Sequence, residues 1–141
     1  MSLYKTFKTS GDLEKTGIYL QYGFVDDDPE KPIRILIARA GGSNTKFARV
    51  LEAKTKPYRR AIHTETMDPK MAEDIFRQVY AEAVVLGWDN VSDADGTPLS
   101  FVKENVVKVF TDLPDLYADV REQANKAALF REAVLEEDAK N

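Results

Sequence analysis

The sequence contains no cysteine and only one histidine among its 141 residues. The missing cysteines exclude disulfides, thiolate zinc sites and cysteine nucleophiles. Because His63 is the single imidazole, the usual histidine sets that hold zinc are excluded as well. His63 lies in the segment AIHTETM, where we expect a partly exposed linker side chain and not a general base.

Long hydrophobic runs are also absent. The chain has no uninterrupted stretch of about 18 apolar residues, which predicts no membrane-spanning helix. Its start, MSLYKTFKTSGD, lacks the apolar run of a signal peptide. The formal net charge of −4 gives no general attraction to nucleic acid or anionic lipid. We therefore expect a cytoplasmic protein without a membrane partner, for which nucleic acid is an unlikely ligand.

Sequence signatures of catalysis are missing too. No serine stands in a GxSxG motif, and GGSN at residues 41–44 matches neither GxGxxG nor a Walker sequence. We expect Gly41 and Gly42 to turn the chain from a strand into a helix, in preference to binding phosphate there. No catalytic residue, metal ligand or cofactor is predicted, and the chain is not expected to be an enzyme.

The segment DNVSDADGTPLSF has the aspartates and the glycine of a calcium-binding loop, but their spacing does not fit. With Gly96 at the sixth position, the first and twelfth ligand positions fall on Val91 and Val102, which have no side-chain oxygen. We therefore predict a structured turn at residues 87–100 that reverses at Gly96, with Trp88 buried beneath it.

Two segments near the amino terminus have the composition of strands. GIYLQYGF is rich in aromatic and β-branched residues, and PIRILIARA has isoleucine at alternate positions. The acidic link VDDDPEK between them predicts an exposed hairpin loop, and LYKTFK is a candidate third strand. We expect residues 1–40 to form an antiparallel β-hairpin or small sheet.

Residues 43–139 are predicted to be helical apart from the turn. SNTKFARVLEAKTK has one apolar helical face with Ser43 or Asn44 as its cap, and Pro57 starts a further short helical turn. The clearest helix begins at the cap Asp68, and its apolar stripe includes the core candidates Ile75, Phe76, Val79 and Tyr80.

We expect this helix to end at Gly87 and the next one to be capped by Ser100. A last helix is predicted from Pro114 deep into the tail, with one face that carries Leu116, Val120, Ala124, Ala127, Phe130 and Val134. The sequence thus predicts a single α+β domain over residues 1–141, mainly helical, with an amino-terminal hairpin or small sheet.

One short region is strongly basic. Between residues 46 and 60, six basic side chains stand against the single acid Glu52: Lys46, Arg49, Lys54, Lys56, Arg59 and Arg60. Few aromatic residues are interleaved, so the cluster favours a solvated face or a surface for an acidic protein over a nucleic-acid platform. The candidate partner-binding residues are Lys54, Lys56, Arg59 and Arg60, with Phe130 and Val134 on the distal face of the last helix.

The order of several segments resembles that of a known family. From about Ile33 to Asn141 these are IARAGGSNTKF, LEAKTKPYRRAI, AVVLGWDNVSDADGTPLSF, ENVVKVFTDLPDLY and QANKAALFREAVLEEDAKN. In this order they resemble the tail assembly chaperones of long-tailed bacteriophages and prophages. The resemblance implies a non-structural protein of the host cytoplasm that binds the helical, aggregation-prone tape measure protein, keeps it soluble and recruits tail tube subunits. It also implies, for many members, a longer form made by programmed frameshifting.

Two other classes of function remain open on the residues alone. A structural tail or connector protein, retained in the virion, is compatible with a hairpin and helices. A nucleic-acid-binding regulator would use the basic cluster, and its binding would weaken steeply with salt. Self-association is open as well.

Overall fold

The computed structural model describes residues 2–131. Its strands are β1 (Ile18–Phe24), β2 (Pro32–Ile37) and β3 (Val85–Asp89). Its α-helices are α1 (Leu3–Phe7), α2 (Gly11–Thr16), α3 (Thr45–Thr55), α4 (Arg59–His63), α5 (Pro69–Ala83), α6 (Lys103–Asp112) and α7 (Pro114–Ala124). Three short 3₁₀ turns complete the described part: η1 (Val25–Asp27), η2 (Lys56–Tyr58) and η3 (Ala127–Phe130).

The three strands form one antiparallel sheet in the order β1-β2-β3. Strands β1 and β2 make the predicted hairpin, in which Ile18 pairs with Ile37, and η1 lies in its acidic loop. The turn predicted at Pro57 is present as η2 and α4. The α+β class with an amino-terminal antiparallel sheet is therefore confirmed.

The prediction of a strand at LYKTFK is wrong, because this segment forms α1. The Ser2 hydroxyl accepts a hydrogen bond from the backbone N–H of Lys5 at 3.1 Å, which caps the helix. The large side chains of Leu3, Tyr4 and Phe7 are exposed, so no core position selects an extended conformation for them. The capping hydrogen bond therefore favours the helical conformation of this segment.

The third strand comes instead from the end of the helix predicted after Asp68. Asp68 caps α5 as predicted, but α5 ends at Ala83, and Gly87 lies inside β3. The β-branched side chains of Val84 and Val85 are buried, and β3 pairs with β2 along its free edge. Residues 43–139 are thus not helical throughout, because sheet pairing outweighs the helical period at this point.

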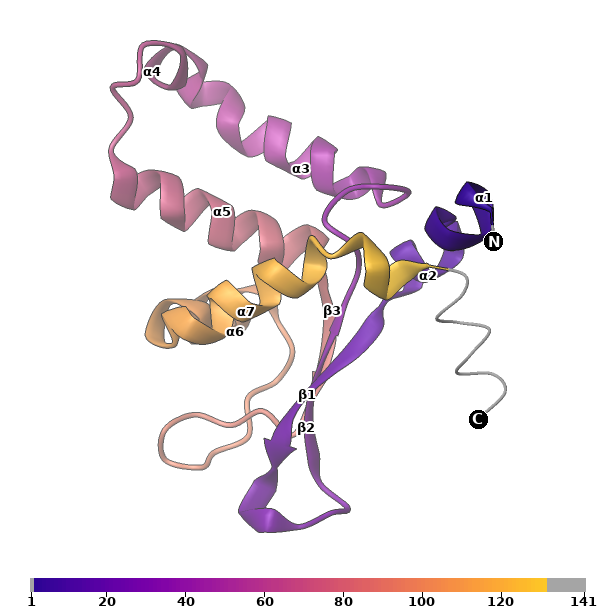
Figure 1. Ribbon diagram of the computed structural model, residues 1–141. Coiled ribbons are helices and arrows are strands. Elements are labelled where there is room, and N and C mark those ends of the chain that lie inside the picture. Colours follow the sequence, from indigo (N-terminus) through magenta and orange to yellow (C-terminus); the bar gives the residue numbers. More distant parts are fainter. Residues whose placement is uncertain (1, 132–141) are drawn as a thin grey trace.

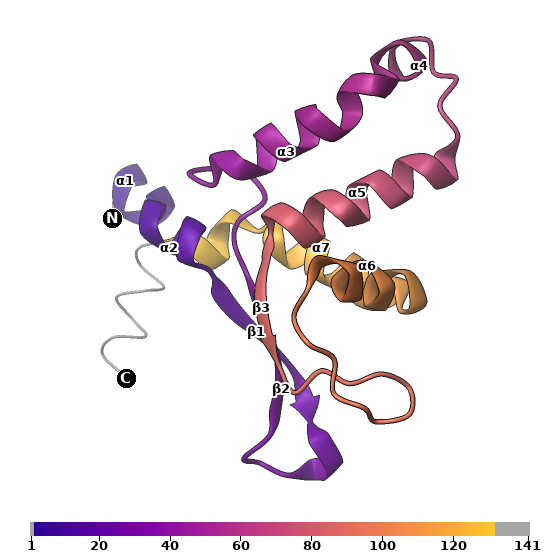
Figure 2. The ribbon, with the colours of Figure 1, turned by 180° about the vertical axis from the view of Figure 1, so that it is seen from behind.

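The core lies between the sheet and the helices α5, α6 and α7. Its buried side chains include Ile35, Ile37, Val84, Val106, Phe110 and Val120. Figures 1 and 2 show α3 and α5 projecting from this body toward α4, while the tip of the β1–β2 hairpin points the opposite way. The loop between β3 and α6 lies beside that hairpin tip in both views.

The segment DNVSDADGTPLSF, whose spacing does not fit a calcium-binding loop, forms a turn, as predicted. Gly96 has φ +83°, and the Asp93 carboxylate accepts hydrogen bonds from the backbone N–H groups of Asp95 and Thr97, both at 2.9 Å. Trp88 is only half-buried, contrary to prediction, and its indole Nε1–H donates to the Leu99 carbonyl at 3.0 Å. The ring also packs against the core and makes an edge contact with Phe101, with centroids 5.5 Å apart.

Two further helix boundaries differ from the predictions. The residue that caps α6 is Val102, without a side-chain hydrogen bond, and not Ser100. The last helix ends at Ala124, because the Asn125 side chain donates to the Tyr80 hydroxyl at 2.9 Å and to the Arg121 carbonyl at 2.7 Å. The chain then continues in η3, so the long apolar face predicted from Pro114 into the tail is interrupted.

Candidate functional site

The helices α3, α4 and α5, with η2, form an arm, residues 44–83, that projects from the sheet (Figure 1). At its base, the buried Asn44 side chain donates to the carbonyls of Arg39 at 2.8 Å and Ala83 at 2.9 Å. Phe47 packs edge-on against Tyr80, with ring centroids 5.6 Å apart. These contacts fix the first turn of α3 to the last turns of α5.

Farther out, the arm contains an apolar groove of about 470 Å³ between α3, α4 and α5. It is lined by Leu51, Thr55, Ile62, Glu65, Met67, Ala72, Ile75 and Phe76. Ile62 is 45% exposed and Phe76 is 40% exposed, so the apolar walls face solvent. Apolar surface gathered in a concave site favours binding of another apolar surface.

The four basic candidate residues all lie on this arm, but none of them lines the groove, and Lys54 lines a separate pocket together with Glu82. Lys54 forms an ion pair with Glu82 at 3.3 Å, and Arg59 lies 3.8 Å from Glu52 with both side chains exposed. Lys56 and Arg60 are exposed and form no ion pair with any residue in the range 2–131. Among these four candidates, the positive charge available to a ligand therefore lies mainly at η2 and α4.

Glu82 reduces the charge at the base of the arm. Its carboxylate accepts a hydrogen bond from the Lys103 ammonium at 3.0 Å, and this bond, together with Lys54, holds the pKa of Glu82 below its usual value. The carboxylate thus stays ionised and partly neutralises Lys54. Among the four basic candidates, Lys56, Arg59 and Arg60 keep the more accessible charge.

The two apolar candidates do not join this site. Phe130 lies in η3 with its side chain fully buried, so the prediction that it faces a partner is wrong. The helix is interrupted after Ala124, and in the following turn η3 the Phe130 side chain lies inward and not on a distal helical face. Val134 lies outside the described residues.

The groove residues were missed by the sequence patterns. Phe76 fits the apolar stripe of α5 and was assigned to the core, yet α3 diverges from α5 at this level and leaves the ring exposed. Ile62 is not part of an amphipathic helical pattern in the sequence. Its position shortly after the basic pair Arg59 and Arg60 was the one sequence feature that could have indicated a binding surface.

The glycine turn before α3 lies against the carboxylate of Glu14. Gly41 and Gly42 have φ +121° and +56°, which confirms the predicted turn from strand to helix. The buried Glu14 carboxylate accepts hydrogen bonds from the Arg39 guanidinium at 2.7 Å and from the backbone N–H of Ser43 at 3.4 Å. A carboxylate of the chain therefore occupies the position where a bound phosphate would sit.

Other types of site have less support in the structure. Within residues 2–131, no three histidine, aspartate or glutamate side chains gather where they could hold a metal ion. His63, at the end of α4, is exposed. No helix of the described part is both long and apolar enough to cross a bilayer. The arm groove, with exposed basic residues on the same arm, is the arrangement best suited to bind another protein.

Comparison with known proteins supports a viral origin. The family model described as YdaY prophage protein matches residues 42–141, which include the whole arm and the helices α6 and α7. No curated protein and no solved structure matches the chain. The family match agrees with the bacteriophage or prophage origin that the sequence resemblance implies, and it covers more than two thirds of the chain. The chain belongs to the YdaY prophage protein family.

Proposed function

We propose that this protein is a non-enzymatic tail assembly chaperone of the host cytoplasm. In this role it binds the tape measure protein and recruits tail tube subunits during tail morphogenesis. The prophage family and the order of sequence segments support the proposal. The observation that carries it is the exposed apolar groove between α3, α4 and α5.

The groove suits an amphipathic helix with an acidic polar face. Such a helix would place its apolar stripe against Ile62 and Phe76 and its carboxylates toward Lys56, Arg59 and Arg60. Apolar burial would supply most of the affinity, at roughly 25 cal/mol per Å² before the costs of association. The basic side chains of η2 and α4 would mainly raise the rate of encounter and fix the orientation. A helical protein that aggregates alone has the apolar stripe this groove requires.

The test is coexpression with the tail genes of the same prophage, followed by pull-down and measurement of soluble tape measure protein. We expect Phe76→Asp to abolish retention of the tape measure protein. The double variant R59E/R60E should slow association and make it more sensitive to salt. Circular dichroism establishes that each variant is folded.

Matched controls are available elsewhere on the surface. Val102→Asp also places a carboxylate at an exposed apolar position, and aspartate is favoured at this helix cap. The double variant K5E/K15E reverses two exposed charges on α1 and α2. Both controls should keep the tape measure protein soluble. Normal solubility and normal tails with folded Phe76→Asp and R59E/R60E would show that the groove is not the chaperone site.

The protein content of purified virions distinguishes this role from that of a structural component. A chaperone leaves before the particle matures, so mass spectrometry of purified particles should lack this protein. Its presence there in stoichiometric amount would favour a tail or connector protein instead.

A further inference from the structure

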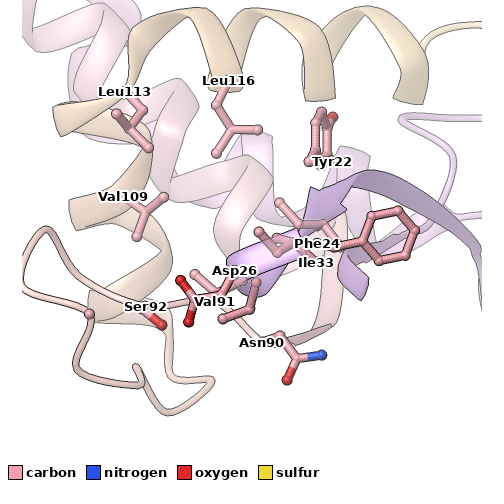
Figure 3. A pocket seen from close by; sticks show the side chains of 13 residues that line it. Tyr22, Phe24, Asp26, Ile33, Asn90, Val91, Ser92, Val109, Leu113 and Leu116 are labelled. Carbon is pink, nitrogen blue, oxygen red and sulfur yellow. The ribbon is translucent and has the colours of Figure 1, made fainter. Parts of the chain in front are cut away.

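A second apolar cavity, of about 500 Å³, lies between the β1–β2 hairpin, the loop after β3 and the α6–α7 pair, and it shares no lining residue with the arm groove. Figure 3 shows Val109, Leu113 and Leu116 along one side of it, facing Ile33 on the hairpin, while the ring of Phe24 points away from them. Val91, from the loop after β3, completes the apolar lining. Three segments distant in sequence thus converge on one cavity, hereafter the tip cavity.

The tip cavity is open to solvent. Leu113, between α6 and α7, is 52% exposed, and Phe24, at the end of β1, is 42% exposed. Ile35 and Val109, which also line the cavity, are buried in the protein. The cavity therefore runs from an exposed apolar mouth to a buried apolar floor, a shape that fits one large apolar side chain.

The surroundings of the tip cavity are acidic. The segments that line it, residues 22–35, 90–96 and 109–116, carry eight acidic side chains and two basic side chains, and one of the basic ones, Arg34, pairs with Asp89. Some of the carboxylates in and near these segments are already engaged within the chain: Asp28 and Asp93 accept backbone N–H groups, Asp112 pairs with Lys108, and Asp119 accepts the Tyr22 hydroxyl. Such groups are poorly available to a ligand.

Asp26 and Asp27 differ from these engaged groups. Both are exposed, neither forms an ion pair with a residue of the described range, and Asp26 lines the cavity itself. Their φ angles of +50° and +58° place both residues in the left-handed region, which aspartate and asparagine tolerate better than most residues. This backbone conformation holds the unpaired carboxylate of Asp26 at the cavity, with that of Asp27 on the next residue of the chain.

We propose that the tip cavity binds an extended segment of another protein that carries a large apolar side chain next to a lysine or arginine. The apolar side chain fills the cavity, and the cation pairs with Asp26 and Asp27. This charge preference is opposite to that of the arm groove, so the two sites select different segments. The inference rests on the cavity and its charges and does not depend on the tail assembly role.

The test uses two fluorescein-labelled peptides with a central phenylalanine, flanked by lysines in one and by glutamates in the other. Fluorescence anisotropy measures their binding to the full chain. We expect saturable binding of the lysine peptide, weaker binding at higher salt, and at least about tenfold weaker binding of the glutamate peptide.

Variants of the chain locate the site. The double variant D26N/D27N keeps side-chain size and the left-handed backbone, and it should weaken lysine-peptide binding about fivefold. Leu113→Ser should weaken it further, and Phe24→Ser serves if that variant does not fold. The control E73Q/D74N removes two acidic charges from exposed positions on α5 and should bind the peptide normally, as should the arm variant R59E/R60E.

Several results would overturn the inference. These are no saturable binding, equal binding of the two peptides, or unchanged binding in folded D26N/D27N and Leu113→Ser. Loss of binding in R59E/R60E would assign the peptide to the arm. Self-association that D26N/D27N removes, without peptide binding, would identify a second copy of this chain as the occupant.

Discussion

At the scale of single residues, Glu14 connects the amino-terminal segment to the start of the arm. Burial alone raises the pKa of its carboxyl, but hydrogen bonds from Arg39, Thr9 and Ser43 outweigh burial and hold the pKa below the usual 4.5. The ion pair therefore contributes stability that is fully present above about pH 4.5 and is lost as the pH falls through the folded-state pKa.

We predict that Glu14→Gln lowers the free energy of unfolding by about 1–3 kcal/mol at pH 7, because charge-assisted hydrogen bonds are lost. The difference from the unmodified chain should shrink as the pH falls below about 4.5. Urea denaturation at several pH values measures both effects. Glu73→Gln, on the exposed face of α5, is the control and should change stability by less than about 0.5 kcal/mol. A difference that stays constant down to acid pH would contradict the assigned role.

Trp88 gives a second prediction at this scale. Trp88→Phe keeps an aromatic ring beside Phe101 but removes the hydrogen bond from the indole to the Leu99 carbonyl. We expect a loss of about 1 kcal/mol and faster amide hydrogen exchange in the loop before α6. Unchanged exchange there would mean that the indole does not hold the loop.

At the scale of elements, the attachment of α3 to α5 depends on Asn44. Its amide satisfies two carbonyls at the base of the arm, so Asn44→Ala leaves buried acceptors without a partner. We predict a loss of about 1–3 kcal/mol and increased hydrogen exchange throughout α3. Asn105→Ala, which removes a similar bond to the Ser100 carbonyl at an exposed site, should cost less than about 1 kcal/mol. Equal losses in the two variants would contradict a special role for Asn44.

The elements also show what the sequence could predict. The hairpin and the start of α5 depend on local signals, namely alternation in PIRILIARA and the Asp68-Pro69 cap, and both were predicted. Strand β3 was missed because Val84 and Leu86 continue the helical apolar period of α5. Only the free edge of β2, a tertiary feature, selects the strand.

Only the part of the candidate site that depends on contiguous residues could be predicted from the sequence. The basic cluster is contiguous in sequence, so its charge was visible, and the structure adds that Glu82 partly neutralises Lys54. The groove depends on how far α3 diverges from α5, which no local pattern encodes. Phe130 was misplaced because the end of α7 depends on the contact between Asn125 and Tyr80.

At the scale of the whole molecule, the basic arm and the β1–β2 hairpin, which lines the acidic tip cavity, project from one body in different directions (Figure 2). Their exposed charges share no ion pair within residues 2–131. We predict that R59E/R60E and D26N/D27N change the free energy of unfolding additively, within about 0.5 kcal/mol, when they are combined. Urea denaturation of the two double variants and the quadruple variant measures this. A larger deviation would reveal coupling between the arm and the hairpin.

The pairing of β3 with β2 has a consequence for the boundaries of the folding unit. The family match begins at residue 42, after β2. Within the described residues it therefore includes β3 but not β2, the strand with which β3 pairs. Ile35 and Ile37, also outside it, belong to the core. A chain shortened to residues 42–141 would thus expose both an unpaired strand edge and the apolar surface of α6 and α7. Because an unpaired strand edge can pair with the strand of another chain, the shortened chain should aggregate. Light scattering would detect this aggregation.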